Sequence, residues 1–199
     1  MLKTRWQASE GRVDSGEDKA PVVKSESNHI YYYSNVETKS CLDLNKALQD
    51  KADDLLAIAA KNSFGRPKIY LHINSYGGSI FAGISSMDTI LQLKNYVDII
   101  TLVEGGVASA ATFISVVGTE RKMTRNSYML IHQLSSMTLG KYAELKDDMK
   151  NCDELMKMIK NIYAQYTEVP TEEIDKILDH DLWWDAETCL KYKLIDEII

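Results

Sequence analysis

The chain has 199 residues, of which 45% are hydrophobic and 26% are charged. This length suits one domain, or one domain with a helical appendage, and this composition excludes a disordered protein. There are 23 basic and 29 acidic residues, so the net charge of −6 argues against nucleic acid or an anionic membrane as a partner. No apolar run approaches the roughly 18 residues of a spanning helix, and we therefore expect a cytoplasmic protein without a membrane segment.

Cysteine and histidine spacings indicate neither a disulfide framework nor a metal site. The three cysteines are widely separated and form no CxxC pair, as is usual in a reducing cytosol. The four histidines show no HExxH motif or clustered ligand spacing. We expect no bound metal.

Strand and helix patterns alternate along most of the chain. Residues 1–28 are polar and without periodicity, which predicts a flexible N-terminal arm before a folded domain over 29–199. Within that domain, strands are expected at 30–33, 68–73, 97–103 and 128–131, and helices at 40–62, 79–94, 108–117, 171–178 and 186–192. We place a capping-box start of the first helix at Ser40, and helix caps at Thr171 and Asp185. The alternation predicts an α/β fold, a parallel sheet covered by helices.

The stretch from about 139 to 166 has a different pattern. Its apolar residues recur at intervals of three and four, which predicts a long helix with a narrow apolar seam. Such a seam suits pairing with a helix of another copy, and packing on the chain's own domain is the alternative. The seam residues are Tyr142, Leu145, Met149, Cys152, Met156, Ile159, Tyr163 and Tyr166.

Two glycine-containing turns follow predicted strands and open predicted helices. In the first, Asn74–Ser79 (NSYGGS), paired glycines allow backbone N–H groups to approach a ligand, although an ordinary strand-to-helix turn has the same pattern. In the second, Glu104–Thr112 (EGGVASAAT), Ser109 stands at a helix start among small residues. There its hydroxyl could meet a carbonyl, and the next backbone N–H could face the developing oxyanion. Close packing alone is the simpler interpretation of such a serine.

His132 ends the strand pattern YMLIHQ and is the candidate general base. An imidazole beside Ser109 could take the hydroxyl proton, and a third group would then be needed to orient the ring. Spacing does not choose between the aspartates on the C-terminal side, which are Asp175, Asp179, Asp181 and Asp185.

Four motifs in this order resemble one family. They are KIYLHINSYGGS, GGVASAATF, RNSYMLIHQ and HDLWWDAETCLKYKLIDEI, and together they extend the resemblance from about Ile30 to Ile199. The chain resembles the Clp protease proteolytic subunit family, the ClpP-type serine peptidases that enclose their active sites in a chamber. The resemblance implies a crotonase-type head of repeated ββα units with a long-helix handle.

The same resemblance implies a role for each matching residue. Ser109 corresponds to the nucleophile, His132 to the general base and Asp181 to the orienting carboxylate. Gly78 and Ala110 correspond to the backbone donors of the oxyanion hole. The implied activity is serine-type endopeptidase hydrolysis of peptides or unfolded proteins, without a metal or organic cofactor.

The family also implies partners. Seven heads form a ring, handles of two rings interdigitate, and an AAA+ unfoldase feeds the resulting chamber. Here the family's NSPGG turn has Tyr76 in place of proline, and two aromatic positions of the unfoldase-docking clefts hold His72 and Gln92. Because of these departures, the sequence supports serine peptidase chemistry better than it supports docking of a standard unfoldase.

Other interpretations remain open beside this one. The chain could be a non-catalytic or regulatory ring subunit, or a phage-type maturation protease that works without an unfoldase. A crotonase-type acyl-CoA hydratase or hydrolase would share the glycine turn but usually has acidic catalytic residues. A relative of signal-peptide peptidases would need a lysine base, which no motif marks.

Overall fold

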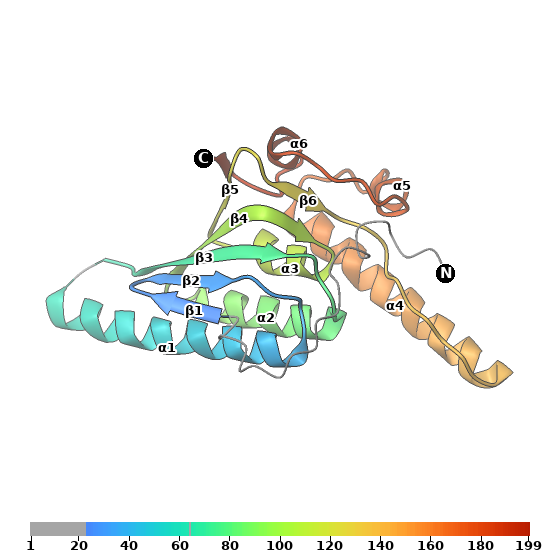
Figure 1. Ribbon diagram of the computed structural model, residues 1–199, viewed down its shortest axis with the longest axis horizontal. Helices are drawn as coiled ribbons and strands as arrows, with labels where there is room; N and C mark the ends of the chain where they lie inside the picture. Colours follow the sequence, from blue (N-terminus) through green and yellow to red (C-terminus); the bar gives the residue numbers. More distant parts are fainter. Residues whose placement is uncertain (1–22, 64) are drawn as a thin grey trace, which may run out of the picture.

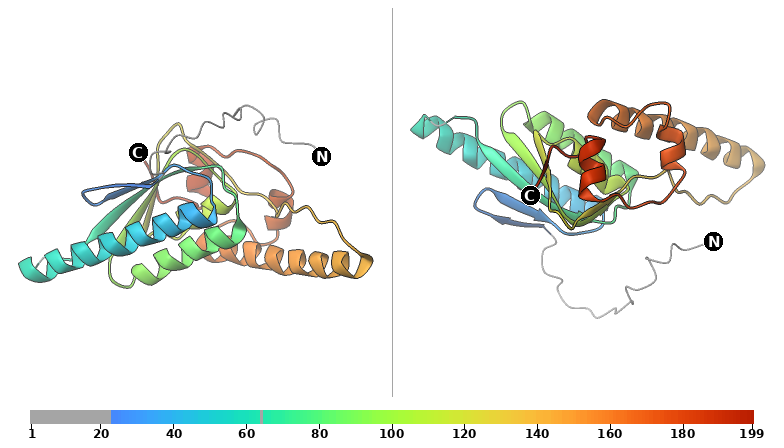
Figure 2. Two further views of the ribbon diagram at one scale, coloured as in Figure 1. Left: turned by 60° about the horizontal axis from the view of Figure 1, so that its bottom comes forward. Right: turned by 90° about the horizontal axis from the view of Figure 1, so that it is seen from above.

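The computed structural model describes residues 23–63 and 65–199 (Figure 1). A seven-stranded sheet forms the head, with α1 and α2 on one face (Figures 1 and 2). The strands are β1 Val23–Glu26, β2 His29–Tyr32, β3 Lys68–Ser75, β4 Asp98–Ala108, β5 Glu120–Met123, β6 Tyr128–Leu130 and β7 Glu197–Ile198. The helices are α1 Thr38–Asn62, α2 Ile80–Leu93, α3 Ala110–Val116, α4 Tyr142–Tyr166, α5 Ile174–Leu178 and α6 Ala186–Lys191. The expected α/β class is confirmed.

The order of the strands brings their carboxyl ends to one edge of the sheet. The order is β1-β2-β3-β4-β5-β7, and β6 pairs separately with β4. Apart from the antiparallel β1–β2 hairpin, all these pairs are parallel. Loops that leave the carboxyl ends of β3, β4 and β6 therefore start side by side, where α/β proteins usually bind their ligands.

An irregularity in β4 changes the partner of that strand. Between the pairs Ile73↔Val103 and Ser75↔Val107, β4 advances two residues more than β3, as in a bulge. Gly105 lies in this bulge with φ 75°, and a Cβ there would stand 2.8 Å from Asn74 Nδ2. Before the bulge β4 pairs with β5, and after it with β6. The bulge thus directs the end of β4 to β6.

Local sequence accounts for the helix starts only in part. Asp185 caps α6 as predicted, because its Oδ1 accepts a hydrogen bond from the Thr188 N–H at 2.9 Å. The predicted start of α1 at Ser40 is wrong, because the helix begins at Thr38. Glu37 is the N-cap, and Ser40 is the N3 residue of the capping box. The predicted cap at Thr171 is also wrong, since Glu173 takes the N-cap position of α5.

Residues 23–26 differ from the expected N-terminal arm. They form β1, which pairs with β2 from Val23↔Tyr32 to Glu26↔His29. A four-residue strand of mostly exposed residues has no strong sequence signal, and its partner strand supplies the stabilisation. The remainder of the predicted arm, residues 1–22, lies outside the described residues.

Helix α4 is the long helix predicted from the 3–4 periodicity, and only its C-terminal part is buried. Its buried residues are Ile159, Ile162 and Tyr163, and its N-terminal part projects beyond the head (Figure 1). The Tyr163 hydroxyl lies 2.7 Å from Thr112 Oγ1 in α3. Because Thr112 Oγ1 donates to the Ser109 carbonyl at 2.6 Å, it accepts the bond from Tyr163. One buried hydrogen-bond chain thus joins α4 to the start of α3.

Substitution of Tyr163 tests this connection. We expect Tyr163→Phe to lower the free energy of unfolding by about 1 kcal/mol, because it leaves a buried acceptor of Thr112 without its donor. Urea unfolding of the assembled protein measures the change. Tyr96→Phe, at an exposed position of the head, is the control and should leave the midpoint unchanged. Equal midpoints for both variants would contradict the connection.

Candidate active site

The candidate site forms where three strand ends meet. Ser75 of β3 pairs with Val107, and Ala108 of β4 pairs with Leu130 of β6. The residues that follow these pairs are the NSYGGS turn, Ser109 and His132. Segments that are far apart in the sequence therefore converge at one edge of the sheet.

Ser109 occupies a strained backbone conformation between β4 and α3. Its φ of 56° and ψ of −132° lie outside the usual regions for a residue with a side chain, at a cost of about 1–3 kcal/mol. Its N–H donates to the Leu130 carbonyl at 2.9 Å, and its carbonyl accepts from Thr112 N at 2.9 Å. These bonds, together with that from Thr112 Oγ1, hold the strained turn. A sharp strand-to-helix turn of this kind presents a serine hydroxyl at the edge of a sheet.

The NSYGGS turn packs directly on Ser109. A Cβ on Gly77, whose φ is 89°, would lie 2.6 Å from Ser109 Cβ and 3.2 Å from Ala110 N. Only glycine fits this approach. Among the described residues, no hydrogen bond uses the N–H of Gly78, and the N–H of Ala110 belongs to the first turn of α3, where intrahelical acceptors are lacking. The N–H groups of Gly78 and Ala110 are therefore both without an acceptor among the described residues.

The side chains of His132 and Asp181 lie in contact with each other. His132 Nδ1 lies 3.2 Å from Asp181 Oδ1, with 22% and 51% of the two side chains exposed. Between the described residues, no hydrogen bond joins Ser109 Oγ to the imidazole. The structure thus places a histidine in contact with an aspartate two residues after β6, the strand next to Ser109.

The four candidate aspartates have different environments. Asp175 pairs with Lys160. Asp185 caps α6, and hydrogen bonds from Thr188 hold the pKa of its carboxyl below the ordinary value. Asp179 is the exposed C-cap residue of α5. Asp181 is the aspartate that the structure places against His132.

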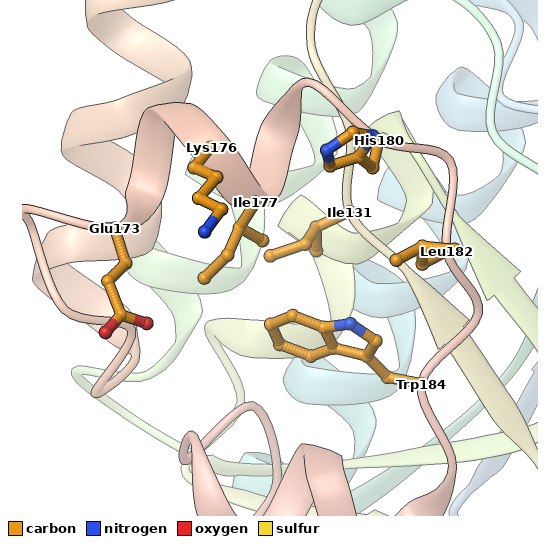
Figure 3. A pocket seen from close by; sticks show the side chains of 7 residues that line it. All are labelled: Ile131, Glu173, Lys176, Ile177, His180, Leu182 and Trp184. Carbon is orange, nitrogen blue, oxygen red and sulfur yellow. The ribbon is translucent and has the colours of Figure 1, made fainter.

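A pocket of about 300 Å³ lies beside the segments of His132 and Asp181, and Figure 3 shows the side chains that line it. Three of its lining residues are sequence neighbours of the pair: Ile131 precedes His132, and His180 and Leu182 flank Asp181. Figure 3 shows the Trp184 indole beside Ile131 and Ile177, with Glu173 and Lys176 at the side of α5. A group that entered the pocket would contact both the segment of His132 and the segment of Asp181.

Some residues that build the site had no clear sequence signal. Thr112 looks like an ordinary helix residue, although a threonine three positions after a helix-opening serine is a local hint of the bonds it makes. The support from the Leu130 carbonyl depends on the β4 bulge, which the sequence marks only by its glycine pair. The contact between Tyr76 and Trp183 joins segments more than 100 residues apart, and no local pattern indicates it.

The described part of the chain contains no cluster of three or more histidine, cysteine or acidic side chains placed to hold a metal ion. Over the same residues, no helix combines the length and the apolar character that a membrane span requires.

Fold and geometry define the class of protein: an α/β protein with a serine at a strained turn and a histidine–aspartate pair beside it. The family model described as Clp protease matches residues 25–199. The chain belongs to the Clp protease family.

Two curated relatives and one solved structure show the extent of the similarity. The chain is 35% identical over 133 residues to ATP-dependent Clp protease proteolytic subunit 1 of Streptomyces coelicolor, a match that covers 66% of this chain but only 60% of that protein. It is 31% identical over 162 residues to the ATP-dependent Clp protease proteolytic subunit of Oltmannsiellopsis viridis, covering 79% and 80% of the two chains. The solved structure of a ClpP1 mutant from Listeria monocytogenes aligns with a TM-score of 0.73 at 23% identity, over 87% of this chain and 91% of that chain. The last comparison confirms the fold expected from the resemblance.

The close approach of Gly77 to Ser109 predicts a large effect of one methyl group. Gly77→Ala should lower the free energy of unfolding by roughly 2 kcal/mol or more, because it combines a left-handed backbone with contacts below 3 Å. Gly65→Ala is the matched control, since its Cβ would meet nothing within 4 Å. Thermal and urea unfolding of both variants measure the difference. Equal stabilities would show that the turn does not pack on Ser109 as described.

Proposed function

We propose that the chain is a self-compartmentalising serine endopeptidase that hydrolyses peptide bonds of peptides or unfolded proteins. The observation that carries the proposal is the convergence of Ser109 at its strained turn with the His132–Asp181 pair. Membership of the Clp protease family supports the same activity.

Acylation is the first step. Ser109 Oγ attacks the carbonyl carbon of the scissile peptide bond, and His132 accepts the hydroxyl proton. The N–H groups of Gly78 and Ala110 donate hydrogen bonds to the oxyanion, and Asp181 keeps the imidazole oriented. When the tetrahedral intermediate collapses, the C–N bond breaks, and the amine leaves with the proton from His132. The product on the enzyme is an ester of Ser109.

Hydrolysis of this ester restores the enzyme. His132 removes a proton from water, the resulting hydroxide adds to the ester carbonyl, and the same N–H groups hold the second oxyanion. Collapse returns the proton to Ser109 Oγ and releases the carboxylic acid. Every group in this cycle is a side chain or backbone N–H of the chain, and the proposal includes no cofactor.

The missing bond between Ser109 Oγ and His132 is compatible with this role. Catalytic hydrogen bonds are often long without substrate and shorten in the complex. A substrate strand or a neighbouring subunit at the site would complete the alignment.

The exposed part of α4 supports assembly with other copies. Leu139, just before this helix, is fully exposed, and Met149 within it is 66% exposed. Apolar residues on a projecting helix favour burial in an interface. We propose that these handles pair between stacked rings, heptameric as in the family, and enclose the active sites in a cytoplasmic particle.

The docking position of the family has an unusual polar composition here. His72 Nδ1 lies 3.0 Å from Glu104 Oε1, and His72 Nε2 lies 2.8 Å from His29 Nδ1. Tyr33 also donates to Glu104, and burial together with this bond raises the pKa of the phenol. The same histidines stack on tyrosine rings, His72 on Tyr31 and His29 on Tyr70, with 4.3 and 4.8 Å between ring centroids. We propose that an AAA+ unfoldase for this protein would dock through mixed polar and aromatic contacts at this position.

Labelling with a fluorophosphonate probe, together with hydrolysis of a short fluorogenic peptide, tests the activity. We expect both signals in the wild type, and neither in Ser109→Ala, because the probe bonds to an activated serine. His132→Ala should lose roughly 10²–10⁴-fold in rate, as expected for the removal of a general base.

Asp181→Asn and Asp179→Asn are a matched pair of variants that tests the role of the orienting carboxylate. The first should reduce the rate because the amide no longer orients the imidazole, and the second should not, because Asp179 does not contact His132. Labelling that persists in Ser109→Ala would contradict the proposal. A well-folded, assembled wild type without labelling would favour the non-catalytic ring subunit instead.

Assembly through α4 has its own test. Met149→Asp should lower the particle mass in sedimentation, because a charge buried in an apolar interface is costly. Tyr96→Asp, at a position of similar exposure in the head, should retain the wild-type mass. Unchanged mass for Met149→Asp would place the interface elsewhere.

A further inference from the structure

Two aromatic side chains meet across the candidate site. The rings of Tyr76 and Trp183 are 6.0 Å apart between centroids and inclined by 89°, an edge-to-face arrangement. Tyr76 stands two residues before Gly78, and Trp183 stands two residues after Asp181. The contact therefore joins the turn of the oxyanion donor to the segment of the orienting carboxylate.

Gly106 of β4 lies directly against both rings. A Cβ at this position would lie 3.1 Å from Tyr76 Cε1 and 3.7 Å from Trp183 Cη2. Because the backbone of Gly106 lies outside the left-handed region, space for the rings accounts for glycine here. The pair thus lies against β4, the strand that directly precedes Ser109.

The segment of Asp181 is held at both ends, and on its N-terminal side the carbonyl of the buried Leu178 accepts from Gln133 N at 2.8 Å. Beyond Trp183, the backbone of Trp184 exchanges two hydrogen bonds with Met129 of β6, at 2.9 and 2.7 Å, and its indole stacks on Tyr192. Before Trp183, Asp181 and Leu182 are exposed. Trp183 is the side chain that links this segment to the oxyanion turn.

We propose that Tyr76 and Trp183 act as a pair of positioning residues that hold the oxyanion turn and the Asp181 segment in one arrangement. This inference rests on the proposed peptidase function. Neither ring touches the reacting atoms: Tyr76 acts through the N–H of Gly78, and Trp183 acts through Asp181 and His132. Loss of either ring frees both segments, so the two losses should not multiply.

A double-mutant cycle on the assembled protein tests the pair, with a fluorogenic peptide as substrate. Tyr76→Ala and Trp183→Ala should each lower kcat by about 3- to 10-fold, the range of aromatic-pair energies, with KM changed less than about twofold. The double variant should lose no more kcat than the less active of the two single variants. Trp183→Phe keeps an aromatic ring and should recover most of kcat.

Two further variants separate positioning from general packing. Gly106→Ala should lower kcat by a smaller factor, because its methyl group displaces the Tyr76 ring without removing it. Tyr96→Ala is the control, since Tyr96 is 63% exposed and Tyr76 is 64% exposed. We expect it to retain the wild-type kcat.

The outcomes separate this inference from the proposed function. A wild type that hydrolyses nothing and takes no fluorophosphonate overturns both. If the wild type is active, three results would overturn this inference alone: an unchanged kcat in the variants, single losses that multiply in the double variant, or a rise in KM in place of a fall in kcat. Circular dichroism and particle mass establish folding, and where Trp183→Ala does not fold, Tyr76→Ala, Gly106→Ala and Trp183→Phe decide the question.

Discussion

The strained conformation of Ser109 is the constraint on which the rest of the site depends. A left-handed φ at a residue with a side chain persists only where the surroundings over-determine it. Here the Ser109 N–H is held by β6, and its carbonyl by Thr112, whose hydroxyl in turn accepts from Tyr163 of α4. The long helix therefore contributes to the geometry of the site as well as projecting from the head.

The bulge in β4 explains how one strand can serve both the core and the site. Up to Val103 the strand pairs with β5, and from Gly106 it pairs with β6. Without the bulge, a regular β4 would continue along β5, and Ser109 would not reach the Leu130 carbonyl. Parallel pairing with β3 and β6 then places the glycine turn and His132 on either side of the serine. The bulge in β4 thus brings the ends of β3, β4 and β6 together.

Sequence patterns predicted the parts of this structure that depend on local chemistry. The long helices, the central strands and the cap at Asp185 follow from periodicity and side-chain capping, and Ser109 and His132 follow from their places at strand ends. The short strands β1, β5 and β7 contain at most one buried residue each and so lack the apolar pattern of the equally short β2 and β6, and their pairing depends on the sheet around them. Spacing left four aspartates equivalent. Only the tertiary path of the segment before α6, fixed by the Met129–Trp184 bridge, brings Asp181 to His132.

Backbone groups supply most of this site, and this explains where the sequence can depart from its family. The proposed oxyanion donors are N–H groups, and the serine turn is held largely by carbonyl and N–H bonds, which side-chain changes leave in place. Tyr76 can therefore replace a proline without removing the Gly78 N–H, provided that another contact stabilises the turn. The Trp183 ring over Gly106 is such a contact. At the position proposed for unfoldase docking, side chains would make the contacts, so His72 with its bonds to His29 and Glu104 would change the chemistry that such a partner meets.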